Sequence, residues 1–256
     1  MLRIEHLTKT YGEKKAVDDL SLHIAPGEIY GFIGHNGAGK TTTLKSIAGI
    51  LQFDAGDIRI GGISIREDPL ACKRLMAYIP DNPDLYEYMT GIKYLNFIAD
   101  IFGVSADDRQ ARIRDYAARF ELTDDLAQPI AAYSHGMKQK LAIISAWLHQ
   151  PRLILMDEPF AGNDVFNRED FYKVLLGILE PNETIVLSTH LIEEVSGFLG
   201  RAVLLHKGQI VGDAQLSDLE EQGQTLMDYV KSSYHYQSDR VSRALSDLTG
   251  KEDTDA

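Results

Sequence analysis

A glycine-rich loop near the N-terminus restricts the fold of this chain more than any other feature. The sequence Gly-His-Asn-Gly-Ala-Gly-Lys-Thr at residues 34–41 matches the pattern G-x-x-x-x-G-K-[ST]. An apolar, strand-like run at residues 29–33 precedes the loop, and a helical pattern at residues 40–48 follows it. Because strand, loop and helix in this order form a phosphate-binding site, the segment predicts an α/β nucleotide-binding fold.

The residues of this loop have distinct predicted tasks. Glycines let the main chain wrap so that its N–H groups point toward a triphosphate, and the helix N-terminus adds a positive dipole end. Lys40 is expected to reach the β- and γ-phosphates, and the Thr41 hydroxyl is expected to bind Mg²⁺. The predicted nucleotide-binding residues of the loop are Gly34, Asn36, Gly37, Ala38, Gly39, Lys40, Thr41 and Thr42.

Two acidic residues follow a buried strand candidate in the second half of the chain. Four apolar residues at 153–156 precede Asp157 and Glu158. Since α/β sheets bind ligands at the carboxyl ends of their strands, Asp157 is predicted to hold Mg²⁺, directly or through water. Glu158 is predicted to act as general base, or as the group that orients the attacking water. Taken alone, the pair fits a solvated strand end equally well, and the phosphate loop favours the catalytic interpretation.

Composition limits the partners of the chain. It has 26 Lys and Arg against 38 Asp and Glu, a formal net charge of −12. An acidic chain lacks the clustered cations that nucleic acids require, so no nucleic-acid partner is expected.

The longest apolar run, near residues 142–148, is far shorter than the roughly 18 residues of a membrane-spanning helix. Cys72 is the only cysteine, which excludes an intrachain disulfide and fits a reducing compartment.

Hydrophobic periodicity divides the chain into regions. Residues 1 to about 30 predict short strands, and residues 58–65 predict a hairpin. Helical spacing dominates from about 82 to 150, after which α/β patterns return. We therefore predict one unit over residues 1–220 with a helical lobe at about 82–150, and a tail over 221–256 that begins with a small helical appendage and ends in a mobile segment.

A third motif narrows the family. Residues 133–139 read Tyr-Ser-His-Gly-Met-Lys-Gln, and Ser134 lies 94 residues after Lys40 and 23 before Asp157. This segment resembles the signature motif of the ATP-binding cassette (ABC) family, in the Y-S-x-G-M-[KR]-Q variant of many prokaryotic exporter cassettes. The likeness extends over about residues 2–220 and implies a P-loop NTPase with a RecA-like core, an antiparallel β-subdomain and a helical lobe.

The resemblance also implies roles for individual residues. Ser134 and Gly136 would bind the γ-phosphate held by an opposite cassette, so that two ATP molecules join a head-to-tail dimer. Tyr11 would stack on adenine, and His190 would contact the γ-phosphate and Glu158. The loop at residues 161–164 would cross to the partner cassette.

One position departs from the family pattern. Members usually carry glutamine after the strand that follows the hairpin, where this chain has Asp81. We expect Asp81 to approach Mg²⁺, although its charge opposes that of the γ-phosphate.

Taken together, the motifs predict an ATP-hydrolysing subunit of an ABC transporter that uses ATP and Mg²⁺, with Glu158, His190 and Lys40 as catalytic residues. The expected partners are an integral membrane permease on a separate chain and a second cassette, identical or different. The expected location is cytoplasmic, at the inner face of the cell membrane, and the signature variant favours export over import.

Two alternatives remain at this stage. The first is a soluble ABC ATPase of translation or DNA repair, which a single cassette and an acidic chain disfavour. The second is a regulatory module that binds nucleotide without hydrolysing it. Glu158 argues against that module, and Asp81 argues weakly for it.

Overall fold

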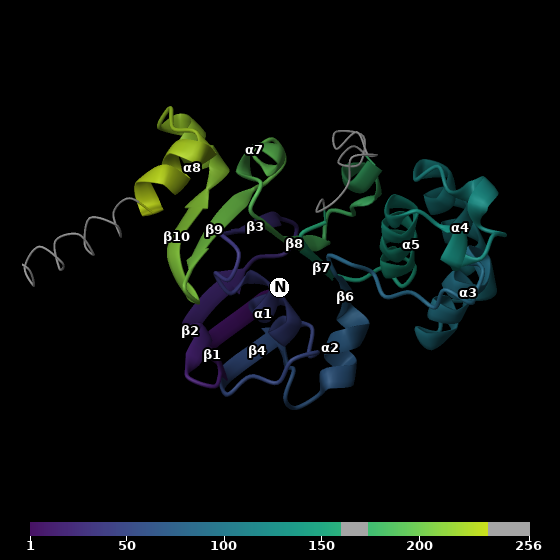
Figure 1. Cartoon of the computed structure of the whole chain (residues 1–256), viewed down its shortest axis with the longest axis horizontal. Helices are drawn as coiled ribbons and strands as arrows, with labels where there is room; N and C mark the ends of the chain where they lie inside the picture. Colours follow the sequence, from purple (N-terminus) through teal and green to yellow (C-terminus); the bar gives the residue numbers. More distant parts are fainter. Residues whose placement is uncertain (160–173, 235–256) are drawn as a thin grey trace, which may run out of the picture.

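The computed structural model of the chain describes residues 1–159 and 174–234, shown in Figure 1. Its strands are β1 (Leu2–Tyr11), β2 (Lys14–Ile24), β3 (Ile29–Ile33), β4 (Ala55–Ile60), β5 (Ile63–Ser64), β6 (Met76–Ile79), β7 (Leu153–Asp157), β8 (Thr184–Thr189), β9 (Arg201–His206) and β10 (Gln209–Gln215). Its α-helices are α1 (Lys40–Ile47), α2 (Pro69–Leu75), α3 (Gly91–Ile101), α4 (Ala106–Arg119), α5 (His135–Trp147), α7 (Ile192–Val195) and α8 (Leu216–Glu221). Short 3₁₀ turns cover Thr123–Asp125 and Ile130–Ala132.

The strands form two sheets. The central sheet has the order β10-β9-β3-β8-β7-β6, and its strands pair in parallel except for β10, which is antiparallel to β9. The second sheet is antiparallel, with the order β2-β1-β4-β5. Where the sequence pattern predicts short N-terminal strands, the structure has two long ones. Register shifts near residues with positive φ, His6 and Asp19, interrupt the side-chain alternation without ending either strand.

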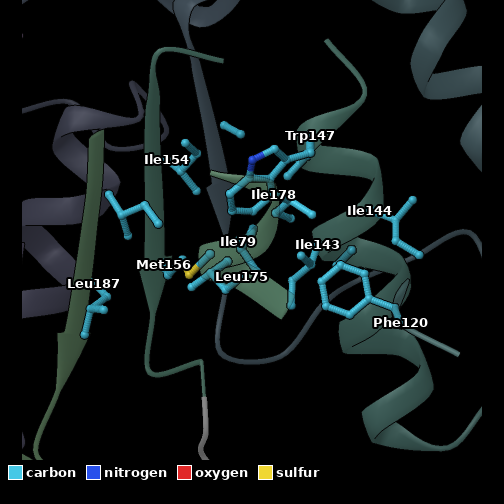
Figure 2. Close-up of a cluster of buried hydrophobic side chains, with 14 of the residues drawn as sticks. Ile79, Phe120, Ile143, Ile144, Trp147, Ile154, Met156, Leu175, Ile178 and Leu187 are labelled. Carbon is cyan, nitrogen blue, oxygen red and sulfur yellow. The ribbon is translucent and has the colours of Figure 1, made fainter. Parts of the chain in front are cut away.

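The central strands are apolar on both faces because each face borders a separate core. In β7, Ile154 and Met156 face a core shared with the helical region, whereas Leu153 and Leu155 face a core shared with α1 and the antiparallel sheet. Figure 2 shows the first of these cores around Trp147. Burial on both faces explains the continuous apolar run at this strand, as is usual for parallel sheets.

Three helices, α3, α4 and α5, lie together at the β6 side of the central sheet (Figure 1). Each begins at a hydroxyl side chain that accepts a main-chain N–H of the first turn, from Thr90, Ser105 and Ser134 respectively. Trp147, at the end of α5, is 1% exposed, and its indole N–H donates to Glu183 Oε2 at 3.3 Å. Burial raises the pKa of Glu183. The helical region is thus joined to the rest of the chain by apolar packing and by buried hydrogen bonds such as this one.

The segment after β10 packs against the central sheet. Helix α8 and a further helical segment at residues 226–234 bury Leu216, Leu219, Leu226 and Val230. The hydroxyl of Tyr234 donates to the main-chain oxygen of Leu205 at 3.1 Å, which fixes this segment beside β9. None of the helices that the structure describes is long and apolar enough to cross a lipid bilayer. The predicted crossing loop at 161–164 and tail residues 235–256 lie outside the described residues.

Parallel register brings the functional segments to one edge of the central sheet. Ile33 of β3 pairs with Thr189 of β8, and Asp157 of β7 pairs with Ser188 of β8. The chain therefore leaves β3, β7 and β8 at the same edge, where the phosphate loop, Glu158 and His190 follow. This edge is the carboxyl end of the parallel strands, where open α/β sheets bind ligands.

The burial of β7 on both faces gives a stability prediction. Replacing Ile154, which is fully buried in β7, with alanine should lower the free energy of unfolding by about 2–5 kcal/mol, because it removes buried methyl groups and leaves a cavity. Urea unfolding followed by fluorescence of Trp147, the only tryptophan, measures the change. Ile101→Ala is the control, since that side chain is 61% exposed and its loss should change stability by less than about 0.5 kcal/mol. Equal losses in the two variants would contradict this core.

Candidate nucleotide-binding site

The phosphate loop is held so closely that two of its glycines are required. Gly39 has φ 109°, and a Cβ there would lie 2.6 Å from the main-chain oxygen of Ala16. A Cβ at Gly34 would lie 2.6 Å from the main-chain oxygen of Leu205. Both distances are shorter than carbon and oxygen tolerate, so the loop must use glycine where it passes β2 and β9.

The loop leads into α1 with its N–H groups free of side-chain partners. Helix α1 begins at Lys40, and its N-cap residue, Gly39, makes no side-chain hydrogen bond. Because the first N–H groups of a helix have no intrahelical acceptor, they are available to an anion. In front of them lies a cavity of about 350 Å³, lined by Tyr11, Lys14, Ala16, Asn36, Gly37, Gly39, Lys40, Thr41, Thr42, Asp81 and Glu158.

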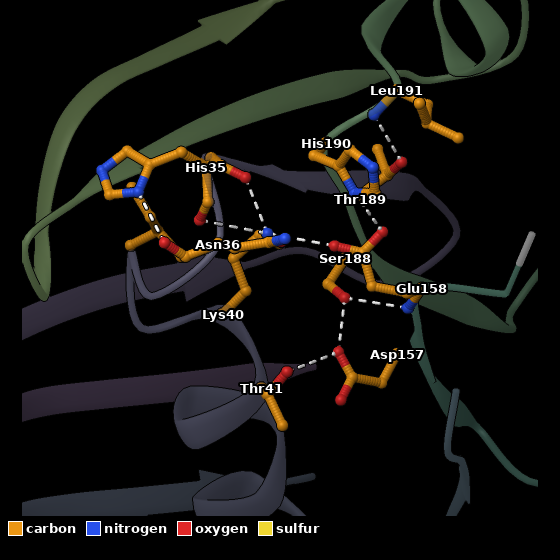
Figure 3. Close-up of polar contacts among 12 residues, drawn as sticks. His35, Asn36, Lys40, Thr41, Asp157, Glu158, Ser188, Thr189, His190 and Leu191 are labelled. Carbon is orange, nitrogen blue, oxygen red and sulfur yellow. Dashed lines mark hydrogen bonds and ion pairs between the residues drawn. The ribbon is translucent and has the colours of Figure 1, made fainter. Parts of the chain in front are cut away.

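Lys40 connects the loop with the acidic side of this cavity (Figure 3). Its side chain is 5% exposed, and its ammonium group donates to the main-chain oxygen of Gly34 at 2.6 Å. The same Nζ lies 3.0 Å from Glu158 Oε1 and forms an ion pair with it. The lysine is therefore buried with compensated charge, and it is placed between the phosphate loop and the acids that follow β7.

Asp157 is buried among hydroxyl groups from three elements. It is 1% exposed, and its Oδ1 accepts hydrogen bonds from Thr41 Oγ1 of α1 at 3.0 Å and from Ser188 Oγ of β8 at 2.6 Å. Its Oδ2 accepts from the Tyr78 hydroxyl of β6 at 3.4 Å. Burial, followed by the charges of Asp157 and Asp81, raises the pKa of the Tyr78 phenol, so that group stays protonated as a donor.

The residues around Asp157 offer oxygen donors of the kind that Mg²⁺ prefers. The Thr41 hydroxyl and the Asp157 carboxylate lie side by side, and Asp81 lines the same cavity as Thr41. Within residues 1–159 and 174–234, no three His, Cys, Asp or Glu side chains converge as metal ligands. One hydroxyl and two carboxylates, from Thr41, Asp157 and Asp81, nevertheless fit Mg²⁺, because this ion is usually held by one or two carboxylates together with the phosphates of a nucleotide.

Glu158 and His190 form a second polar pair at this edge. His190 Nδ1 lies 2.9 Å from Glu158 Oε2. Since a carboxylate only accepts hydrogen bonds, Nδ1 must carry a proton and donate it to Glu158. Glu158 also has φ 43°, a left-handed conformation that costs about 1–3 kcal/mol in a residue other than glycine. The chain thus turns sharply where β7 ends.

Tyr11 and Asp81 lie at the border of the same cavity. The Tyr11 ring is 51% exposed, and the ammonium group of Lys9 lies 5.4 Å from the ring centre. An exposed aromatic face beside a phosphate loop can stack against a flat ring system. Asp81 follows β6 and lines the cavity together with Glu158, so the predicted base and the unusual aspartate border one space.

Ser134 and Gly136 lie elsewhere, at the start of α5, and neither lines the cavity of its own chain. Ser134 is exposed and caps α5 by accepting the N–H of Met137 at 3.2 Å. Gln139, in the next turn, is buried and donates to the main-chain oxygen of Pro159. The signature segment therefore contacts the chain immediately after Glu158, although it contributes nothing to the cavity itself.

Three polar residues of the site were not predicted from the sequence. Lys14 lines the cavity, and Tyr78 and Ser188 hold Asp157. One feature of the sequence could have indicated Ser188: it is a hydroxyl residue near the carboxyl end of a strand, two positions before His190. Tyr78 and Lys14 had none, because tyrosine inside a strand and lysine at a turn are ordinary placements.

Comparison with known protein families gives an independent assignment. The sequence model of the family described as "ABC transporter" matches residues 17–161. A similar protein is the ABC transporter ATP-binding protein NatA of Bacillus subtilis, which is 32% identical over 226 residues. That alignment covers 86% of this chain and 92% of NatA.

Two solved structures share the fold. One, the ATP-binding subunit of an ABC transporter, is 31% identical with a TM-score of 0.84, and the match covers 91% of this chain and 99% of that one. The other is an ATP-binding cassette solved as a dimer in a post-hydrolysis state with ADP and phosphate. It is 25% identical with a TM-score of 0.76, and the match covers 84% of this chain and 99% of that one. The predicted fold, a P-loop NTPase with an antiparallel β-subdomain and a helical lobe, is confirmed.

The position of Lys40 generates a binding prediction. Lys40→Met keeps the length of the buried side chain but removes its charge, and hydrogen bonds to charged groups contribute about 1.5–3 kcal/mol. The affinity for ATP in the absence of Mg²⁺ should therefore fall by about 10- to 100-fold, as measured by equilibrium titration. Lys45→Met, in the last turn of the same helix, is the control and should bind ATP as the unmodified chain does. Unchanged affinity in Lys40→Met would remove Lys40 from the site.

Proposed function

Because the chain belongs to the ABC transporter family as an ATP-binding subunit, we propose that it hydrolyses ATP to drive transport through a separate membrane permease. The observation that carries the proposal is the arrangement of Glu158 between Lys40 and His190, at 3.0 Å and 2.9 Å, beside the buried Asp157. Phosphate-binding groups, an acid for Mg²⁺ and a base for water are thereby within one polar network.

The ion pair between Lys40 and Glu158 suggests how nucleotide starts the reaction. A triphosphate in the cavity presents anionic oxygens to the N–H groups of α1 and competes with Glu158 for the Lys40 ammonium group. Transfer of Lys40 to the phosphates frees Glu158 Oε1. Glu158 is then available to act on the attacking water.

Thr41 and Asp157 would hold Mg²⁺, with Asp81, in the segment after β6, as a further ligand. When bound, the ion stabilises negative charge that develops on the phosphate oxygens. The role of Asp81 differs from that of an amide at this position, because the carboxylate adds negative charge near the cavity.

Glu158 is the proposed general base, with His190 as its partner. Glu158 accepts a proton from the water that attacks the γ-phosphate, and His190 orients the carboxylate through its Nδ1–H. Through its other ring nitrogen, His190 would contact the γ-phosphate, as the family resemblance implies.

A second cassette completes the proposed site. Ser134 and Gly136 lie at the exposed start of α5, where a helix N-terminus can bind an anion, but they do not line the cavity of their own chain. A head-to-tail dimer would bring them to the γ-phosphate of a neighbouring cassette. A related cassette was solved as a dimer with ADP and phosphate, which supports the pairing of two cassettes.

A groove between the central sheet and the helical region is the proposed contact with the permease. It has a volume of about 370 Å³, and α3, α5 and β6 supply eight of its seventeen lining residues. Its lining is largely apolar, and His149 adds little charge because burial lowers its pKa and keeps the ring neutral. A cytoplasmic helix of a membrane protein fits such a groove. The signature variant at residues 133–139 favours export as the direction of transport.

The base assignment predicts a specific separation of activities. Glu158→Gln should lower the rate of phosphate release by about 10²- to 10⁴-fold, because the amide cannot accept the proton of water. ATP-dependent dimerisation, followed by gel filtration with light scattering, should persist, since the phosphate loop and Ser134 are intact. Undiminished turnover in this variant would exclude Glu158 as the base.

The groove gives a separate test of the permease contact. Ile98, on α3, lines the groove, so Ile98→Asp should reduce the membrane-bound fraction of the protein in cells that naturally produce it. Basal ATP hydrolysis by the purified variant should stay unchanged, which also shows that the variant folds. Ile101→Asp, on an exposed position of the same helix outside the groove, is the matched control. Equal membrane binding by both variants would exclude this docking surface.

A further inference from the structure

Ser188 lies where the two acids of the site meet the neighbouring strand. It is the partner of Asp157 in the parallel register of β7 and β8, and it is fully buried. Register partners of adjacent parallel strands project side chains toward the same face of a sheet. The Ser188 hydroxyl and the Asp157 carboxylate are therefore neighbours because of strand pairing, as Figure 3 shows.

The hydroxyl of Ser188 connects Asp157 with Glu158. It lies 2.6 Å from Asp157 Oδ1 and 3.0 Å from the main-chain nitrogen of Glu158. A carboxylate only accepts and an N–H only donates, so the single hydroxyl proton goes to Asp157 and a lone pair receives the Glu158 N–H. One side chain thus bonds to the side chain of the first acid and to the main chain of the second.

The hydrogen bonds from Ser188 hold Glu158, the residue with the strained main chain. Glu158 has φ 43°, and its N–H lies between two acceptors of Ser188, the hydroxyl at 3.0 Å and the main-chain oxygen at 3.2 Å. A left-handed conformation in a residue other than glycine persists only where surrounding bonds hold it. Ser188 supplies both of these bonds, so the direction in which the Glu158 side chain leaves β7 depends on it.

We propose that Ser188 is a positioning residue for ATP hydrolysis, which sets the placement of Glu158 relative to the metal-binding carboxylate of Asp157. The proposal rests on the proposed function and adds a residue that acts only through these two acids. Groups that orient metal ligands and catalytic groups typically change metal affinity or activity by about 10- to 100-fold when they are removed.

Removal of the hydroxyl should leave the fold intact. In Ser188→Ala, Asp157 Oδ1 keeps its bond from Thr41, and the Glu158 N–H keeps the main-chain oxygen of residue 188. No buried polar group loses its last partner, so the melting temperature should fall by no more than about 2–4 °C. Circular dichroism during heating measures this shift before any kinetic comparison.

The experiment compares ATP hydrolysis by the full-length chain and its variants over a range of Mg²⁺ concentrations. Ser188→Ala should lower kcat by about 10- to 100-fold and raise the half-saturating Mg²⁺ concentration, while ATP affinity measured in EDTA stays unchanged. Ser188→Thr keeps the hydroxyl and should recover most of kcat. A purely structural role would not shift the Mg²⁺ dependence while sparing metal-free ATP binding.

Ser64→Ala is the matched control. Ser64 is 2% exposed, its hydroxyl donates to Asp57 Oδ1 at 2.7 Å, and it accepts the Arg66 N–H at 3.3 Å, so the same bonding pattern is removed far from the site. This variant should hydrolyse ATP as the unmodified chain does.

Two kinds of failure are distinguishable. If Ser188→Ala keeps more than half of kcat, or if Ser188→Thr, folded, is no better than Ser188→Ala, the positioning role is overturned while the proposed function stands. An unmodified chain without ATP hydrolysis, alone or with its membrane partner, would overturn the proposed function and this inference together.

Discussion

The parallel pairing of β3, β8 and β7 is the constraint on which the rest of the site depends. It ends three strands at one edge of the sheet, so that the phosphate loop, the two acids and His190 leave the sheet side by side. Apolar burial on both faces stabilises that pairing, because each strand contributes alternate side chains to two separate cores. The polar residues at the edge can then be buried and still find partners, as Asp157 does among three hydroxyl groups.

Backbone strain and close contacts between main-chain segments are concentrated at the same edge of the central sheet. Gly39 passes so near Ala16 that no side chain fits, and Glu158 adopts a left-handed conformation directly after β7. Both features are held by the neighbouring strands rather than by the segments themselves. Such placement is typical of functional sites, where a rigid scaffold keeps a loop in a conformation that it would not adopt alone.

The helical region contributes to the site indirectly. Its signature segment contacts the chain beyond Glu158 through Gln139, and Lys138 of the same helix forms an ion pair with Glu87, in the segment that follows Asp81. A groove lined in part by Ala142, Ser145 and Ala146 of α5 is open to a partner. Movement of α5 in response to a partner would therefore be felt by the segments that follow both Glu158 and Asp81, which connects the proposed docking surface with the proposed chemistry.

The sequence by itself determined the phosphate loop, the acids after an apolar strand, the helical region and the family, because these depend on local order and on spacing along the chain. It left out Ser188 and Tyr78, and it could not show that Lys40 forms an ion pair with Glu158. Those contacts join residues that are 30, 79 and 118 positions apart, in the pairs Glu158 with Ser188, Tyr78 with Asp157, and Lys40 with Glu158. Only the parallel register of the strands brings them together, since register is fixed by packing across the whole sheet and not by any one segment.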